Sequence, residues 1–178
     1  MKYRLTEETF QFGSHILHRI ECVTAFAHVK VGDKGGWIES EANLSQYGDA
    51  WVCGNAKVCD NAKVCDNAKV CDNAWVCDNA WVYGDAEVYG NAWVYGNAWV
   101  CGDAKVCGDA DYIVFKNWWS SGRYYTWTRS NNKWRVGCFY GTGEELIAKA
   151  YKDSEVSGRE YQRVVDYVKS ILQDCKPD

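Results

Sequence analysis

Apolar and polar positions alternate with a strict six-residue period between Tyr47 and Tyr112, through eleven copies of one unit. The unit reads Ala-x-Val-(Cys/Tyr), followed by Gly or Asp and then by Asn or Asp. Alternation along a strand sends Ala and Val to one face and the other two residues to the opposite face. The Gly/Asp–Asn/Asp pair tolerates the left-handed backbone of tight turns. This pattern predicts a parallel β-helix, triangular in cross-section, with about three hexapeptides per coil.

The period extends upstream of Tyr47 with one interruption. Ile38 and Leu44 are six residues apart, as the repeat requires, but Leu44 and Val52 are eight apart. We therefore expect two extra residues to bulge at a corner near Gln46. The predicted β-helix then spans residues 37–112 and has roughly four coils.

The unit Val-(Cys/Tyr)-(Gly/Asp)-(Asn/Asp)-Ala-x resembles the hexapeptide signature of left-handed parallel β-helices, which many acyltransferases contain. The resemblance implies a left-handed coil, against the usual right-handed crossover preference. We expect a mainly β protein built on a left-handed parallel β-helix, with an N-terminal cap and a small C-terminal α+β domain.

Outward side chains should form columns, because residues 18 apart lie above one another on successive coils, at the strand spacing of about 4.8 Å. One column alternates in charge and suits a solvated face, whereas the other two carry tryptophan. The columns are Trp51, Lys69, Glu87 and Lys105; Lys57, Trp75 and Trp93; and Lys63, Trp81 and Trp99.

Two adjacent faces therefore carry stacked aromatic rings at the predicted surface. A contiguous apolar patch of this kind usually marks a partner or a covering domain, although aromatic ladders also stabilise strand pairing by themselves. We expect burial against another subunit, a partner protein or the C-terminal domain, and we expect a homo-oligomer, either a dimer or a trimer. The predicted interface residues are Trp75, Trp81, Trp93, Trp99, Tyr83 and Tyr95.

Seven of the ten cysteines occupy the outward Cys/Tyr position of the repeat. The period stacks Cys53 on Cys71 and Cys59 on Cys77. The segment after Met1 does not have the form of a signal peptide, no stretch is long enough to span a bilayer, and the repeat exchanges Cys freely for Tyr. We therefore expect a cytoplasmic protein with reduced thiols. The cysteine spacing follows the repeat, with no Cys-x-x-Cys and no nearby His, so we expect no metal site.

The two ends depart from the period. Residues 1–36 contain short alternating apolar segments and a flexible turn cluster over residues 32–36, and we expect them to form an N-terminal cap over the open end of the β-helix. The period breaks after Asp111, and residues 113–178 are expected to form an α+β domain with a β-meander and two helices.

Three antiparallel strands are expected over residues 112–117, 123–129 and 133–140, with a hairpin turn at residues 131–132. In that register one face forms a core of Tyr125, Trp127, Trp134, Val136, Cys138 and Tyr140. Capping boxes over residues 142–145 and 157–160 should open the two helices. The second helix has an apolar stripe that we expect in the core, made of Tyr161, Val164, Val165, Val168, Ile171 and Leu172.

Cations and aromatic residues are interleaved in the region 111–140. This combination can stack a base and neutralise a phosphate, although it also fits a small core with a solvated basic rim. The net charge of the whole chain is −4 and the basic strip is short, so a small anionic, nucleotide-like ligand fits better than a long nucleic acid. The candidate ligand-binding residues are Arg123, Tyr124, Arg129, Lys133, Arg135, Trp118 and Trp119.

The residues of a hexapeptide acyltransferase are not found in the repeats. Those enzymes resemble one another in using a His on the coils as general base, whereas His15, His18 and His28 all precede the repeats. The related carbonic anhydrases need three metal-binding His on the coils, and the repeats contain none. We expect a non-enzymatic protein with no catalytic residues and no cofactor. The alternative is an acyltransferase-like enzyme whose His comes from the N-terminal cap.

Several short sequences resemble known proteins. The segments 2–5 (KYRL), 35–39 (GGWIE) and 43–46 (NLSQ) look like a family of bacterial and prophage hexapeptide-repeat proteins of unassigned function. The segments 137–142 (GCFYGT) and 158–161 (GREY) resemble a domain that follows such repeats in phage and prophage proteins. The resemblance implies a cytoplasmic accessory protein of a phage or its bacterial host. We expect a counter-defence factor that sequesters a small anionic ligand or docks a host protein.

Overall fold

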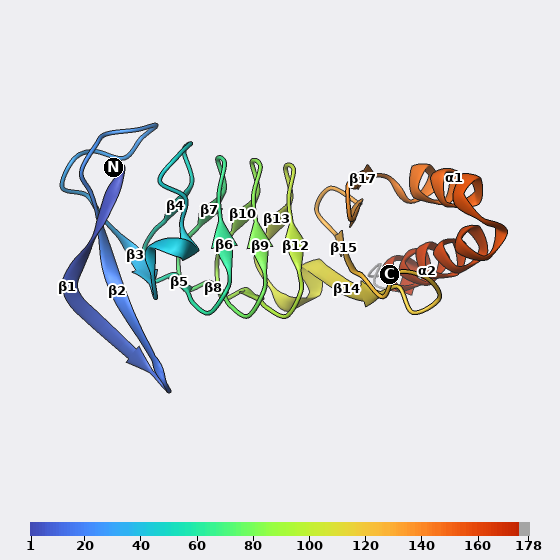
Figure 1. Cartoon of the computed structure of the whole chain (residues 1–178), viewed down its shortest axis with the longest axis horizontal. Helices are drawn as coiled ribbons and strands as arrows, with labels where there is room; N and C mark the ends of the chain where they lie inside the picture. The colour runs from blue at the N-terminus through green and yellow to red at the C-terminus, as the bar shows by residue number, and fades with distance from the viewer. Residues whose placement is uncertain (175–178) are drawn as a thin grey trace.

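A computed structural model of the chain describes residues 1–174. Three parts follow one another along the long axis (Figure 1): an N-terminal β-hairpin, a stack of short coils, and a C-terminal sheet with two helices. No helix in the described part of the chain is long and apolar enough to cross a membrane.

The stack of coils is a parallel β-solenoid, as the repeat predicts. Its strands are two residues long and pair in parallel with the strands 18 residues away, which gives three sheets. The strands are β4 (Trp51–Val52), β5 (Lys57–Val58), β6 (Lys63–Val64), β7 (Lys69–Val70), β8 (Trp75–Val76), β9 (Trp81–Val82), β10 (Glu87–Val88), β11 (Trp93–Val94), β12 (Trp99–Val100) and β13 (Lys105–Val106).

The inward Ala and Val side chains from Ala50 to Val106 fill the solenoid and are fully buried, whereas Ala110 of the last copy is exposed. The two extra residues near Gln46 are also confirmed by the pairing. Leu44 pairs with Val64, 20 residues away, whereas Val52 pairs with Val70, 18 residues away. The Gln46 side chain accepts a hydrogen bond from Lys2 N at 2.7 Å and donates one to Tyr3 O at 3.1 Å. The bulge therefore holds the start of the chain against the solenoid.

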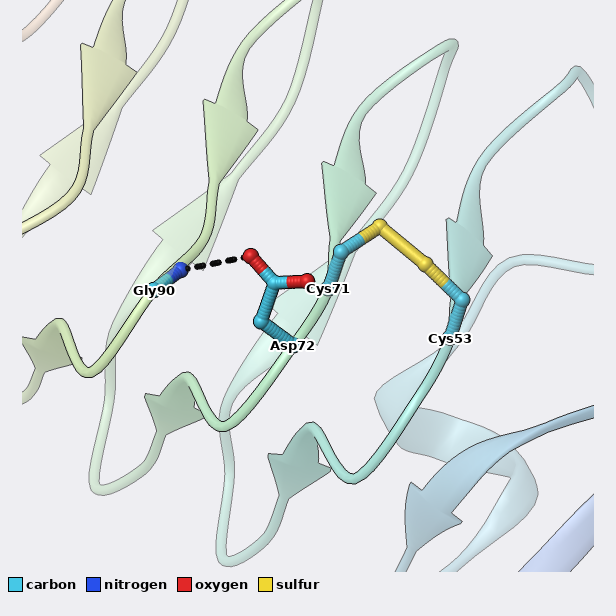
Figure 2. The surroundings of a disulfide bond; sticks show 4 residues. All are labelled: Cys53, Cys71, Asp72 and Gly90. Carbon is cyan, nitrogen blue, oxygen red and sulfur yellow. Dashed lines mark hydrogen bonds between the residues drawn. A yellow bond between two sulfur atoms is a disulfide. The ribbon is translucent and has the colours of Figure 1, made fainter.

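The corners explain why the repeat alternates between Gly and Asp. From Gly48 to Gly102 the first corner residue has a positive φ, from 57° at Asp60 to 71° at Gly84, whereas Gly108 of the last copy has a φ of −155°. Where this residue is Asp, its carboxylate accepts a hydrogen bond from a backbone N–H of the next coil. Figure 2 shows this for Asp72, whose Oδ2 lies 2.9 Å from Gly90 N. The same bond recurs at Asp60, Asp66 and Asp78.

The N-terminal hairpin continues one face of the solenoid. β1 (Tyr3–Phe12) pairs antiparallel with β2 (His15–Cys22), and β2 pairs with β3 (Lys34–Ile38), which in turn pairs in parallel with β5. The prediction of a flexible turn over residues 32–36 is therefore wrong at its end, since Gly35 and Gly36 are buried in β3. A Cβ on Gly35 would lie 2.4 Å from Ile20 Cγ1, so the glycines here permit close packing between strands.

The C-terminal domain contains a four-stranded antiparallel sheet and two helices. The sheet has the order β14 (Tyr112–Lys116), β15 (Tyr124–Thr128), β16 (Lys133–Val136) and β17 (Phe139–Gly141). The helices are α1 (Gly143–Asp153) and α2 (Glu155–Asp174). The Thr142 capping box is confirmed. The prediction that a capping box over residues 157–160 opens the second helix is wrong. The helix α2 already begins at Glu155, and the Ser154 hydroxyl accepts a hydrogen bond from Ser157 N at 3.1 Å.

The predicted core face of this sheet is confirmed in part. Tyr125, Trp127 and Trp134 are buried against Tyr161, Val165 and Val168 of α2. Val136, Val164 and Leu172 pack on this core, and Ile171 is partly exposed. Cys138 and Tyr140 are exposed, so their predicted place in the core is wrong. Gly137 has a φ of +56°, and the chain reverses there between β16 and β17 instead of continuing as one strand.

The other face of the sheet covers the open end of the solenoid. Thr126 Oγ1 accepts a hydrogen bond from Trp99 N at 2.9 Å, and Ser130 Oγ accepts one from Lys105 N at 2.7 Å. Asp109 Oδ1 accepts one from Trp93 N at 3.3 Å. These backbone N–H groups belong to the last coil, which has no further coil to pair with. Side chains from the C-terminal segment thus supply hydrogen-bond partners for backbone N–H groups that would otherwise lack one in the protein.

Candidate ligand-binding site

A cleft of about 460 Å³ lies where the last coil of the solenoid meets the C-terminal sheet. The solenoid supplies Asn97 and Trp99, and the sheet supplies side chains from β15, from β16 and from the turn that follows β16. The lining residues are Asn97, Trp99, Arg123, Tyr124, Arg135, Gly137 and Cys138. Three of them, Arg123, Tyr124 and Arg135, are among the ligand-binding residues predicted from the sequence.

Arg135 is positioned by the aromatic rings of the solenoid. Its guanidinium carbon lies 5.6 Å from the ring centre of Tyr83 and 5.6 Å from that of Trp99. Cation–π contact at such a distance holds the guanidinium in place. The Nε of Arg135 is buried and has no hydrogen-bond partner in the described part of the chain. Buried donors are normally satisfied by protein or by solvent, so this donor is an exception inside the cleft wall, and Arg135 meets the cleft through the rest of its side chain.

Arg123 directly precedes β15, and Tyr124 is the first residue of that strand. Tyr124 is 45% exposed, and Lys116 Nζ lies 5.6 Å from its ring centre. Among residues 1–174, neither Arg123 nor Arg135 forms an ion pair. Within the same residues, no carboxylate lines the cleft. The walls thus combine two uncompensated positive charges with two flat aromatic surfaces, Trp99 and Tyr124.

A second hollow of about 520 Å³ adjoins the cleft and shares Asn97 and Tyr124 with it. It is lined on its far side by Tyr95, Tyr112 and Asp109. The carboxylate of Asp109 already accepts a hydrogen bond from the backbone. Of the two adjoining hollows, the cleft therefore carries the positive charges of Arg123 and Arg135. Tyr124 lines both hollows, and Tyr95 lines the second.

Four residues predicted for this site lie elsewhere. Arg129 and Lys133 do not line the cleft; the Asn131 amide and, to a lesser extent, Lys133 lower the pKa of the Asp103 carboxyl. Trp119 packs in the core, with its ring centre 4.9 Å from that of Tyr161. Trp118 is 75% exposed and projects from the loop after β14. Arg123 lies beside the turn that follows β16, with its Nη1 3.4 Å from the position that a Cβ on Gly137 would take.

The tryptophan columns form stacked ladders. Trp75 and Trp93 have ring centres 5.5 Å apart, as do Trp81 and Trp99. Segments outside the repeat cover part of each ladder. The ring centre of Phe12 in the hairpin lies 4.5 Å from that of Trp75, and Arg135 lies over Trp99 and Tyr83. The most exposed rings are Trp93, at 45%, and Tyr95, at 53%.

The repeat cysteines differ in whether they form a disulfide and in how exposed they are. Cys53 and Cys71 are joined by a disulfide (Figure 2), so the prediction that all repeat thiols are reduced is wrong for this pair. The period places their Cα atoms 4.6 Å apart, which is within the range that a disulfide spans. Cys59 and Cys101 are buried, although both point out of the solenoid, because other segments cover them. Cys175 lies outside the described residues.

The three histidines lie on the N-terminal segment, away from the Arg123–Arg135 cleft. His18 Nδ1 contacts Thr6 O at 3.3 Å, and His28 lines a hollow beside Asp49 and Glu87. His15 contacts Glu39 and Asp60 and lies beside two repeat cysteines. Sequence spacing gave no sign of this last cluster, because its members come from three separate segments. Trp99, which was predicted as an interface residue, was missed as a cleft residue.

A comparison with known families matches one part of the solenoid. The family described as the YdcK beta solenoid repeat matches residues 86–102, which include β10, β11 and β12. No curated protein matches the chain. The family match and the three parallel sheets together make this chain a β-solenoid repeat protein.

Proposed function

We propose that this protein is a non-enzymatic binding protein that holds a small, planar, anionic ligand, of the nucleotide class, in the cleft between Arg123 and Arg135. The observation that carries the proposal is that Arg123 and Arg135 both line the cleft beside Trp99 and form no ion pair within residues 1–174. A guanidinium with free donors binds a phosphate group well. The adjacent rings of Trp99 and Tyr124 offer stacking surfaces for a base.

The size of the cleft supports a small ligand. Its volume of about 460 Å³ lies within the range of about 300–1,000 Å³ for small-molecule sites. A long nucleic acid would need an extended basic track, and here Arg129 and Lys133 are separated from the two cleft arginines. The net charge of −4 also disfavours a polyanion.

Isothermal titration calorimetry with adenosine 5′-monophosphate tests the proposal. Ribose 5-phosphate and adenosine serve as probes that lack the base and the phosphate, respectively. We expect the nucleotide to bind more tightly than either fragment. Replacing Arg123→Ala together with Arg135→Ala should weaken binding by about tenfold or more, since one hydrogen bond to a charged group contributes about 1.5–3 kcal/mol.

The matched control is Arg129→Ala with Lys133→Ala, which also removes two positive charges, here from the turn region between β15 and β16. We expect this control to leave nucleotide affinity unchanged. Equal loss in both double variants would indicate a diffuse charge effect and would overturn the assignment of the cleft. Absence of binding by the unsubstituted protein to all three probes would do the same.

We further propose that the protein assembles as a homo-oligomer through the exposed part of its ladders, and that it acts in the cytoplasm of a bacterial host as a phage or prophage accessory that sequesters its ligand. Trp93 and Tyr95 support the oligomer, because they remain exposed where Phe12 and Arg135 cover their neighbours. The same surface also suits docking of a host protein. An acyltransferase-like activity is the competing function, and acetyl-CoA binding lost with His28→Ala would favour it.

A further inference from the structure

His15, Glu39, Cys59 and Cys77 meet on one side of the solenoid. His15 begins β2, next to the tip of the hairpin, and Glu39 directly follows β3. Cys59 and Cys77 follow β5 and β8, which lie on successive coils. The fold thus gathers one imidazole, one carboxylate and two thiols from three segments that are far apart in the sequence.

We propose that these four side chains bind a zinc ion, with His15 Nδ1, Glu39 Oε1, Cys59 Sγ and Cys77 Sγ as ligands. The ligand atoms of His15, Glu39 and Cys59 all lie within 4.8 Å of one another, and Cys77 follows the strand that pairs in register with the strand before Cys59. Zinc with bonds of about 2.0–2.3 Å in a tetrahedral site places neighbouring ligands about 3.3–3.8 Å apart. Cys77 Sγ belongs to a neighbouring group with Asp60 and Asp78, so the site closes when the Cys77 side chain rotates towards His15 and Glu39.

The chemistry of the ligand set favours zinc over the harder divalent cations. Thiolate and imidazole are soft or borderline ligands that select zinc, whereas magnesium and calcium prefer sites made of oxygen alone. Two sulfurs, one nitrogen and one oxygen complete a four-coordinate site. The partly exposed side chains of His15 and Glu39, at 29% and 32%, leave a route for the ion.

Neighbouring groups already orient the ligands. Glu39 Oε2 accepts a hydrogen bond from Asp60 N at 2.6 Å, which turns the other oxygen, Oε1, towards His15 Nδ1 at 3.1 Å. The second ring nitrogen of His15, Nε2, faces Asp60 Oδ1 at 3.7 Å. A carboxylate on the far nitrogen of the ring is the usual arrangement behind a zinc-bound histidine, because it fixes the orientation of the imidazole.

The Cys53–Cys71 pair provides an internal comparison. It has the same separation of 18 residues and the same place in the repeat as Cys59–Cys77. Within residues 1–174, Cys53 and Cys71 belong to no cluster with a histidine, and they form a disulfide. Cys59 and Cys77 are both free thiols, and His15 lies beside Cys59. Zinc at this site would fasten the hairpin to two coils.

Titration of the full-length protein with Co²⁺, as a spectroscopic substitute for zinc, tests the proposal. Two thiolates in a tetrahedral site should give visible d–d bands and near-ultraviolet charge-transfer absorption, and one equivalent of Zn²⁺ should abolish both. Cys77→Ser and His15→Ala should each weaken metal binding by about tenfold or more. Each variant is checked for folding by circular dichroism.

Matched controls are Cys65→Ser and His18→Ala. Cys65 occupies the same repeat position, but the period places Tyr83 rather than a thiol above it, and His18 lies on the same strand as His15. We expect both controls to bind Co²⁺ as the unsubstituted protein does. The proposal is overturned if Cys77→Ser leaves the spectrum unchanged, or if mass mapping finds Cys59 and Cys77 joined as a disulfide in protein purified without oxidant.

Discussion

At the residue scale, the corner aspartates hold adjacent coils together through their side chains. Asp72 adopts a φ of 59° and its carboxylate accepts a hydrogen bond from Gly90 N at 2.9 Å. The left-handed backbone is costly for residues with a Cβ, by about 1–2 kcal/mol, although Asp and Asn tolerate it better. The hydrogen bond to the next coil offsets this cost, so Asp and Gly are both accepted at the corner.

Asp72→Ala should therefore lower the free energy of unfolding by about 1–3 kcal/mol, because alanine keeps the backbone cost and loses the hydrogen bond. Asp72→Gly should change the free energy of unfolding by less than about 1 kcal/mol, since glycine removes both the backbone cost and the hydrogen bond. Urea denaturation followed by tryptophan fluorescence measures the difference. Equal losses in the two variants would contradict this account of the corner.

Lys2 should make stability depend on pH. Its Nζ is buried and donates to Ala50 O at 2.7 Å and to Gly48 O at 3.2 Å. Burial, partly opposed by the nearby Asp49, lowers the pKa of Lys2 from 10.5 to about 8. Below about pH 8, Lys2 is protonated in both the folded and the unfolded protein, and the burial of its charge lowers the free energy of unfolding by its full amount. Between about pH 8 and 10.5 the unfolded state binds more protons, so stability rises with pH.

The comparison that isolates this effect is the unfolding free energy of the native protein minus that of Lys2→Met, measured at about pH 7 and at about pH 9.5. Ionisation of cysteine and tyrosine affects both proteins and cancels in the difference. We expect the difference to shift in favour of the native protein at the higher pH. A difference that stays constant would show that Lys2 keeps an ordinary pKa in the folded protein.

At the element scale, the Cys53–Cys71 disulfide ties β4 to β7 on adjacent coils. A loop of 18 residues closed by a disulfide stabilises a protein by about 3 kcal/mol, chiefly through the unfolded chain. Replacing both residues by serine should lower the unfolding free energy by about 2–4 kcal/mol in oxidised protein. In reduced protein the same substitution should have little effect, and a large effect there would mean that packing, not the disulfide, stabilises this corner.

The sequence predicted the solenoid well and the ends less well. Each coil follows from local rules, since Ala and Val point inward and Gly or Asp turns the corner, and the bulge near Gln46 could be counted. The C-terminal strand that was expected over residues 133–140 depended instead on one glycine, Gly137, whose positive φ splits it. Gly35 and Gly36 resembled a loop in composition, yet they lie in β3 because close packing against Ile20 requires them.

At the scale of the whole molecule, the candidate site was predictable in its chemistry but not in its membership. The sequence indicated arginine with aromatic residues near β15 and β16, and the structure brings Arg123, Tyr124 and Arg135 together. It could not show that Trp99 would join them, because this contact depends on the sheet docking onto the last coil. The His15 cluster was hidden for the same reason, since no local spacing connects the hairpin to Cys59 and Cys77.

The exposed part of the tryptophan ladder predicts the assembly state. We expect Trp93→Lys to shift the protein from an oligomer to a monomer in size-exclusion chromatography with light scattering, because a charge at this position would be buried in the interface. Trp118→Lys is the matched control, since Trp118 is also exposed but lies on the C-terminal loop. A native protein that is monomeric at micromolar concentration would contradict the proposed oligomer.

Native mass spectrometry of the protein purified from cells tests the central proposal most directly. We expect the native protein to carry a bound species of a few hundred daltons, retained in Arg129→Ala with Lys133→Ala and lost in Arg123→Ala with Arg135→Ala. Fragmentation of that species should release phosphate and a base. A native protein that carries no bound mass, or a bound mass retained equally in both double variants, would contradict the assignment of the cleft as a ligand site.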